Sequence, residues 1–137
     1  MNSKQAIIME HIDDTKLKIF QTQLLSSLEK LRNDVSDMLL SSSHVGHKLA
    51  AKQLQKLSND QLVELTSKLD ISSLAHKTNE IKSIDASLND IELGLYGICS
   101  DCEAEIAIQR LETDVTAKRC VICEKKYQKQ KYNQYKL

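Results

Sequence analysis

The four cysteines of this 137-residue chain form two closely spaced pairs. Cys99 and Cys102 make one C-x2-C pair, and Cys120 and Cys123 make a second after seventeen intervening residues. Two thiolates three residues apart fit on one tight turn, and two such turns can complete a tetrahedron of sulfur ligands around a metal ion. Because all four ligands are thiolates and no position stays open for water, the pattern predicts one structural Zn²⁺.

The same cysteines could instead serve as redox-active dithiols or form disulfides. The first residues, MNSKQAIIMEHIDD, lack the apolar block of a secretion signal, and no apolar run approaches the roughly 20 residues of a membrane span. These features indicate a soluble cytoplasmic protein with no membrane association, where thiols stay reduced and more readily hold a metal. We therefore expect zinc and retain a thiol-redox switch as an alternative.

The composition indicates long helices as the elements that must position the cysteines. Aromatic residues make up 4% of the chain, which has one Phe, no Trp and no Pro. A compact core normally uses several large rings, whereas the Leu, Ile, Lys, Glu, Gln and Ser that dominate here suit helices packed along a seam. The formal net charge is zero, so general attraction to nucleic acid or anionic lipid is not indicated.

Apolar residues recur at helical spacing in two stretches of similar length. The first stretch places them seven apart, at Leu17, Leu24, Leu31, Met38 and Val45. The second contains Leu62, Leu65, Leu69, Ile81, Ile84, Leu88, Ile91 and Leu95. The fold class predicted is mostly α: a leader at residues 1–12 and a long antiparallel coiled-coil hairpin at 13–95, with Asp13 as a candidate N-cap.

The turn of the hairpin must fall between the two stretches. Gly46 marks one position, since glycine costs a helix about 1 kcal/mol. The segment LSNDQLVEL at 57–65 is better, because Ser58 or Asn59 can cap a new helix and Asp60 would lie in its first turn. We place the tip near 52–60, which gives two arms of roughly 35–40 residues at about 1.5 Å per residue.

Residues 96–123 are expected to form a small zinc finger that caps the hairpin. A module this small lacks a core of its own, so the metal would supply most of its folding free energy. The alternation in EIAI, which starts at Glu105, predicts a short strand between the cysteine pairs. Residues 124–137 predict a basic C-terminal helix, because 115–137 carry seven Lys or Arg against Glu124 alone.

A family resemblance rests on residues 96–123, which read YGICSDCEAEIAIQRLETDVTAKRCVIC. This stretch resembles the DksA/TraR family of four-cysteine zinc-finger proteins, whose pattern is an aromatic-Gly pair, C-x2-C, E-I, I-x-R-L-E, T-A and C-x2-C. Besides the cysteines, the matching residues are Tyr96-Gly97, Glu105-Ile106, Ile108, Arg110-Leu111-Glu112 and Thr116-Ala117. Residues 19–35 resemble the family's first coil helix more loosely. The resemblance implies a DksA-like paralogue.

The resemblance also implies a non-enzymatic regulator of transcription. Members of the family bind bacterial RNA polymerase, insert the coiled coil into its secondary channel and place acidic tip residues near the active centre, which modulates initiation without DNA binding. The family's D-x-x-D-x-A tip motif is absent here, and Asn59 and Asp60 are the nearest equivalents. We expect RNA polymerase as the partner and a monomeric protein.

The zinc cap and the C-terminal helix would grip the exterior of the polymerase. Arg110, Lys125, Lys126 and Lys129 are the docking candidates on these elements.

Family members also help to bind ppGpp, the alarmone of the stringent response, through basic residues. The matching positions here are His76, Asn79, Ser83 and Glu124. These side chains are poor phosphate ligands, so weak or no synergy with ppGpp is expected.

The basic tail leaves a zinc-finger nucleic-acid-binding protein as a further alternative. Such a protein needs a recognition helix whose Arg or Asn side chains reach base edges. The tail after Cys123 is rich in Lys and Gln and has no Arg, which argues against it. No nucleophile–base pair or phosphate-cradling loop is visible, so an enzyme is not expected.

Overall fold

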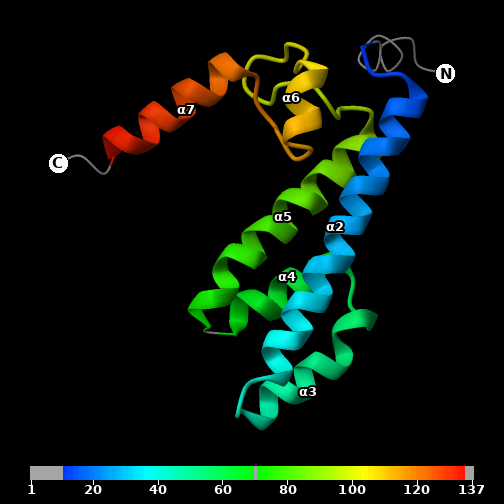
Figure 1. Cartoon of the computed structure of the whole chain (residues 1–137). Coiled ribbons are helices and arrows are strands. Elements are labelled where there is room, and N and C mark those ends of the chain that lie inside the picture. The colour runs from blue at the N-terminus through cyan, green and yellow to red at the C-terminus, as the bar shows by residue number, and fades with distance from the viewer. Residues whose placement is uncertain (1–10, 70, 135–137) are drawn as a thin grey trace. The chain divides into compact units, whose positions relative to one another are not determined.

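The computed structural model of the protein describes residues 11–69 and 71–134. The elements are α2 (Asp14–Leu40), α3 (Val45–Gln53), the 3-10 helix η1 (Leu54–Lys56), α4 (Asn59–Lys68), α5 (Ser72–Leu93), α6 (Ile108–Thr113) and α7 (Val121–Gln134) (Figure 1). The prediction of a mostly-α fold is confirmed. Residues 1–10 of the expected leader and 135–137 of the expected C-terminal helix lie outside the described residues.

The chain divides into two compact units, which we describe separately. Unit 1 consists of Met1–Thr22 and Ser87–Leu137, and unit 2 consists of Gln23–Ala86. Both α2 and α5 contribute residues to each unit. The cysteines belong to unit 1, whereas the predicted tip residues Asn59 and Asp60 belong to unit 2.

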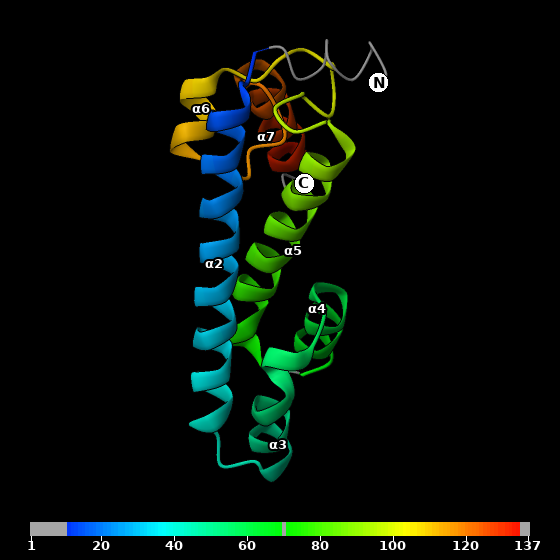
Figure 2. The same ribbon diagram turned by 90° about the vertical axis from the view of Figure 1, so that its right-hand side faces the viewer.

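Unit 2 is built around an apolar seam between α2 and α5, which run antiparallel in Figure 2. An ion pair of 3.5 Å between Asp34 of α2 and Lys77 of α5 flanks this seam. The buried apolar side chains of the unit are Leu24, Leu28, Leu31, Val35, Leu39, Ala51, Leu54, Leu62, Leu74, Ile81 and Ile84. Many of them come from the two predicted stretches, because helical periodicity places these positions on one face.

The connection between the two long helices differs from the single turn that was expected. α2 has 27 residues and α5 has 22, so the prediction of two arms of 35–40 residues is wrong. The predicted tip at 52–60 instead contains the end of α3, η1 and the start of α4. Val45 lies beyond the end of α2 and is 72% exposed, so it is not part of the apolar seam.

The side chain of Ser42 bonds to the backbone just beyond the end of α2. The backbone N–H of Ser41 still makes the helical bond to the carbonyl of Asp37 at 3.0 Å, whereas the Ser42 hydroxyl accepts from the backbone N–H of His44 at 3.1 Å. Such a local bond offers the backbone an alternative to the helical ladder. The helix ends at Leu40 although the seven-residue pattern continues to Val45.

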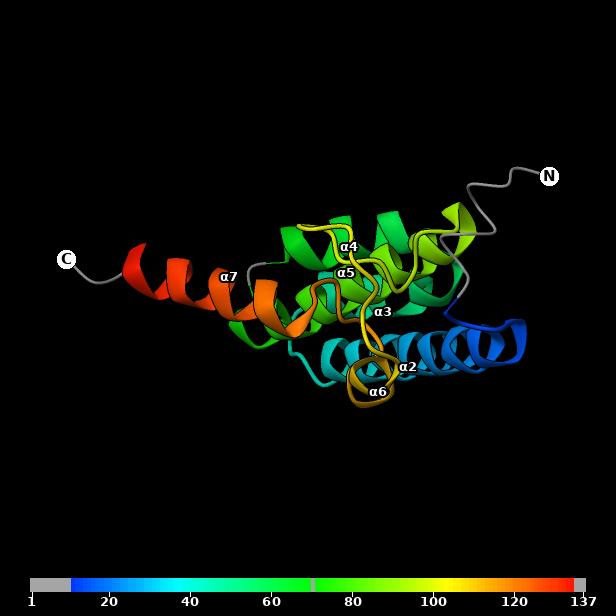
Figure 3. The same cartoon turned by 90° about the horizontal axis from the view of Figure 1, so that it is seen from above.

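Unit 1 packs the beginning of α2 and the end of α5 against the segment that carries the cysteines. The rings of Phe20 and Tyr96 lie 5.7 Å apart, and the Tyr96 hydroxyl donates to the carbonyl of Val115 at 2.7 Å. Lys16 of α2 and Glu112 of α6 form an ion pair of 3.1 Å, with α6 beside the first turns of α2 in Figure 2. Seen from above in Figure 3, α7 leads away from α6.

The N-cap prediction for the first long helix is confirmed. The carboxylate of Asp13 accepts from the backbone N–H of Lys16 at 2.7 Å, which satisfies one of the unpaired donors at the start of α2. Within the described ranges, no helix has the length and apolar content to cross a lipid bilayer.

Candidate metal centre

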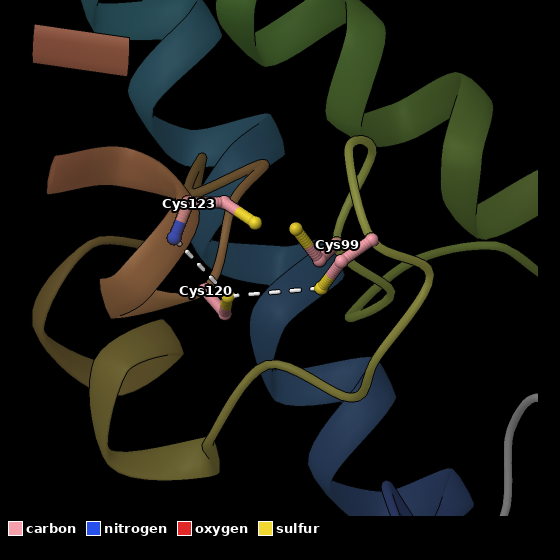
Figure 4. Close-up of side chains that lie close together, drawn as sticks. Cys99, Cys120 and Cys123 are labelled. Atoms are coloured by element: carbon pink, nitrogen blue, oxygen red, sulfur yellow. Dashed lines mark hydrogen bonds between the residues drawn. The ribbon is translucent and has the colours of Figure 1, made fainter. Parts of the chain in front are cut away.

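The four cysteine side chains of unit 1 converge on one point. Their sulfur atoms all lie within 4.8 Å of one another, and those of Cys102 and Cys120 are 3.8 Å apart. Figure 4 shows the labelled Cys99, Cys120 and Cys123 reaching toward a common space. A tetrahedron with Zn–S distances of about 2.3 Å has edges of about 3.8 Å. The donor set and its spacing therefore fit one tetrathiolate zinc ion.

The first cysteine pair lies on a tight turn that follows α5. Gly97 has a φ of 85°, and a Cβ at this position would lie 2.5 Å from Cδ1 of Ile12, so the close approach requires glycine. The backbone N–H of Cys99 donates to the carbonyl of Ala104 at 2.7 Å, and that of Glu103 donates to the carbonyl of Cys99 at 2.9 Å. These bonds fold the chain so that both sulfur atoms face the same side.

The strand predicted between the two cysteine pairs does not form. Ile98 and Glu105 make an isolated antiparallel bridge, and Ile108 already begins α6. A strand needs a partner along its length, and the chain leaves the bridge after one pair. The alternation of EIAI instead buries Ile106, whereas Glu105 is exposed.

The second cysteine pair lies at the start of α7. This helix begins at Val121, three residues before the predicted boundary, so Cys123 occupies its first turn. The backbone N–H of Cys123 points at the sulfur of Cys120 at 3.5 Å. The backbone N–H of Ser100 donates to the carbonyl of Lys118 at 2.8 Å and joins the two cysteine-bearing segments directly.

The pKa values of Cys99 and Cys123 are shifted in opposite directions. Burial raises the pKa of Cys99, but hydrogen bonds from the backbone N–H groups of Cys120, Cys102 and Asp101 outweigh it and lower the pKa to about 6. Hydrogen bonding with the sulfur of Cys120, together with burial, raises the pKa of Cys123 to about 12. Four adjacent thiolates repel one another, so a cation is needed to hold all of them deprotonated.

The four predicted docking residues differ in whether their side chains already bond within the protein. Arg110 of α6 donates from its Nε to the carbonyl of Arg119 at 2.8 Å, so part of its guanidinium is used inside the finger. Lys125, Lys126 and Lys129 of α7 are exposed. Arg119 was not among the predicted site residues, and it contacts Asp101 and the ring of Tyr127. Its position next to Cys120 was the only feature of the sequence that could have pointed to a role for Arg119 near the metal.

The two predicted tip residues in unit 2, Asn59 and Asp60, also differ in their side-chain contacts. The amide of Asn59 accepts from Arg32 at 2.9 Å and donates to Asp85 at 3.0 Å, so it links α2, α4 and α5. Asp60 is exposed in the first turn of α4. The predicted cap is confirmed at Ser58, whose hydroxyl and the Gln61 side chain form a reciprocal capping box.

Comparisons with known proteins find a family model, a curated relative and a solved structure that this chain resembles. Residues 94–129 match the family described as "Prokaryotic dksA/traR C4-type zinc finger". The RNA polymerase-binding transcription factor DksA of Buchnera aphidicola (subsp. Acyrthosiphon pisum, strain APS) is 36% identical over 56 residues, which are 41% of this chain and 37% of that protein. The structure of transcription factor DksA2 from Pseudomonas aeruginosa matches with a TM-score of 0.58 and 17% identity. This match covers 94% of this chain and 98% of that chain, and it shows a shared fold.

The family match and the geometry agree on the metal. The matched segment contains both cysteine pairs, and the sulfur atoms have the spacing of a tetrathiolate site. The predicted cofactor, one structural zinc ion, is confirmed, and Cys99, Cys102, Cys120 and Cys123 are the group of side chains that could hold it.

Proposed function

We propose that this protein binds bacterial RNA polymerase and modulates transcription initiation. The premise is that the chain carries the C4-type zinc finger of the DksA/TraR family and is a DksA-like protein. The observation that carries this proposal is the family match over residues 94–129, together with a DksA2-like fold over 94% of the chain. The curated relative that it matches over 37% of that relative's length is an RNA polymerase-binding transcription factor.

In this proposal the helices of unit 2 enter the secondary channel of the polymerase and present a carboxylate there. Asp60 is the proposed effector, because it is exposed and lies in the first turn of α4. Its backbone position is supported by the Ser58–Gln61 capping box and by the bonds of Asn59 to Arg32 and Asp85. We therefore assign Asn59 to positioning Asp60, since its own amide is engaged on both sides.

The contacts outside the channel are proposed for unit 1. The zinc ion has a structural role, because four thiolates leave no site for a substrate. Lys125, Lys126 and Lys129 supply exposed positive charge on α7 that suits an acidic protein surface. In this proposal Arg110 chiefly supports the finger through its bond to the carbonyl of Arg119.

The proposal includes no enzymatic activity, no direct binding to DNA and little synergy with ppGpp. His76, at one of the positions that the family resemblance relates to ppGpp, pairs with Glu80 at 2.7 Å. Glu124, which follows the last cysteine, brings a carboxylate that would repel phosphate, and it lies 3.7 Å from Arg119. Both observations favour an action that is independent of the alarmone.

Transcription in vitro with purified bacterial polymerase tests the proposed effector. Asp60→Asn removes one exposed charge and keeps the shape of the side chain, so it should reduce the effect of the protein on initiation several-fold without weakening polymerase binding. Asp37→Asn, an exposed acid on α2, is the matched control and should act like the wild type.

Two outcomes would count against the proposal. An unchanged effect of Asp60→Asn would move the effector to another residue. Transcription unaffected by saturating wild-type protein, over promoters with short-lived and long-lived open complexes, would reject the regulatory role itself.

A further inference from the structure

Arg119 contacts two different parts of unit 1 with its side chain. Its Nε donates to Oδ2 of Asp101 at 2.9 Å, and Asp101 lies between the two cysteines of the first pair. On the other side, its Nη1 lies 3.7 Å from Oε2 of Glu124, and its Cζ lies 3.9 Å from the centre of the Tyr127 ring. Both Glu124 and Tyr127 belong to α7.

The backbone of Arg119 adds a third connection. Its carbonyl accepts from Nε of Arg110 on α6 at 2.8 Å. Arg119 also directly precedes Cys120, so any displacement of its backbone moves a zinc ligand. One residue therefore touches the first cysteine turn, the second cysteine pair, α6 and α7.

We propose that Arg119 is a positioning residue that stabilises the zinc site and fixes the direction of α7 through the same side chain. The pair with Asp101 holds the two cysteine turns at the separation that tetrahedral ligation needs. The contacts with Glu124 and Tyr127 orient the helix that carries Lys125, Lys126 and Lys129. Zinc retention and the orientation of the basic helix thus depend on one shared side chain.

Electrostatics and geometry favour arginine for this role. A zinc ion with four thiolates carries a net charge of about −2, which a fixed positive charge nearby offsets. The guanidinium is planar and always charged, so it can donate to carboxylates along its edge while an aromatic ring lies against its face. Arg119 is 25% exposed, so these contacts are only partly screened by water. Outer-shell partners of metal ligands typically change metal affinity by about 10–100-fold.

The first test measures zinc release from the loaded full-length protein to an excess of chelator, followed with a colorimetric zinc indicator. Arg119→Gln and Asp101→Asn should each release zinc about 10-fold faster than wild type. The double variant should be within about 2-fold of the faster single variant, because both changes break one interaction. Lys131→Gln removes one charge from α7 away from the zinc site and should release zinc at the wild-type rate.

The second test measures the order of α7 in the same zinc-loaded proteins by ¹⁵N NMR relaxation. Arg119→Gln should lower the backbone order parameters of residues 121–134 relative to those of α6. Tyr127→Leu should also lower them, since it removes the ring on which the guanidinium rests. Because Tyr127→Leu keeps both members of the Arg119–Asp101 pair, this variant should release zinc within about 2-fold of wild type.

The results can reject each half of the proposal. Wild-type release rates in both Arg119→Gln and Asp101→Asn would overturn the role in zinc retention, and so would strictly additive effects in the double variant. Faster release with unchanged order in α7 would overturn the shared dependence on Arg119. Neither measurement involves polymerase, so a failure here is distinguishable from a failure of the proposed function.

Discussion

Arg32 is the buried charge that holds the connection between α3 and α4. Its Nη1 donates to the carbonyl of Leu54 at 2.8 Å and its Nη2 donates to Asn59 at 2.9 Å. The residue is 9% exposed, so deleting its side chain would leave both acceptors without their partner in a site that water barely reaches.

Arg32→Ala should therefore lower the free energy of unfolding by roughly 2–4 kcal/mol. Urea denaturation of the zinc-loaded protein measures this change. Lys30→Ala, at an exposed position of the same helix, should stay within about 0.5 kcal/mol of wild type. A loss below about 1 kcal/mol for Arg32→Ala would mean that water replaces both bonds.

Zinc binding should depend on each sulfur atom. Cys102 is exposed, so Cys102→Ser removes a ligand with little loss of packing. The purified variant should carry far less than the one zinc per chain of wild type, as measured by elemental analysis. Ser100→Ala, inside the same turn, should retain full zinc, and equal zinc in both variants would contradict four-cysteine ligation.

Acid should release the metal, because protons and zinc compete for the same sulfur atoms. In the metal-free site the pKa of Cys123 is raised to about 12, so zinc must displace a firmly held proton there. Zinc affinity should therefore fall as the pH is lowered from about 8 to 5, which competitive titration with a chelator measures. An affinity that does not change over this range would exclude thiolate ligation.

At the scale of single elements, α4 depends on its cap. The Ser58 hydroxyl accepts from the backbone N–H of Gln61 at 3.2 Å, and the Gln61 side chain accepts from the backbone N–H of Ser58 at 3.0 Å. Ser58→Ala should cost about 1 kcal/mol in urea denaturation. Ser67→Ala, at an exposed position in the last turn of the same helix, should instead be neutral or slightly stabilising. A loss of similar size in both variants would exclude the cap as the cause.

The sequence predicted the start of a helix well where a single capping residue fixes it. Asp13 and Ser58 were identified as candidate caps because a short polar side chain before an apolar stretch pairs with free backbone N–H groups. The end of α2 was missed, because the seven-residue pattern continues through the serines at 41–43. The Ser42 hydroxyl instead bonds to the backbone N–H of His44 just after the helix, and spacing does not reveal such a bond.

The zinc site was predictable from the sequence, whereas the contacts around it were not. Two C-x2-C pairs specify the ligands, because metal geometry restricts their spacing. Arg119 and Arg32 act through partners 18 and 27 residues away in sequence, at Asp101 and Asn59. Such contacts depend on the tertiary fold, which a single sequence does not specify residue by residue.

At the scale of the whole molecule, the central claim is that this zinc-finger protein binds RNA polymerase. The combination of a C4 finger and a DksA2-like fold motivates the claim. The proposed binding uses residues of both units. Loss of the metal should weaken binding, because the finger and the direction of α7 depend on the cysteine site. Cys120→Ser is the variant that tests this dependence.

The most direct measurement is the equilibrium binding of the zinc-loaded full-length protein to purified bacterial RNA polymerase core enzyme, without DNA. We predict a saturable complex with a Kd in the micromolar range or below, which corresponds to at least about −8 kcal/mol, and markedly weaker binding by Cys120→Ser. The absence of a complex at tens of micromolar, with zinc bound and the helices folded, would contradict the account.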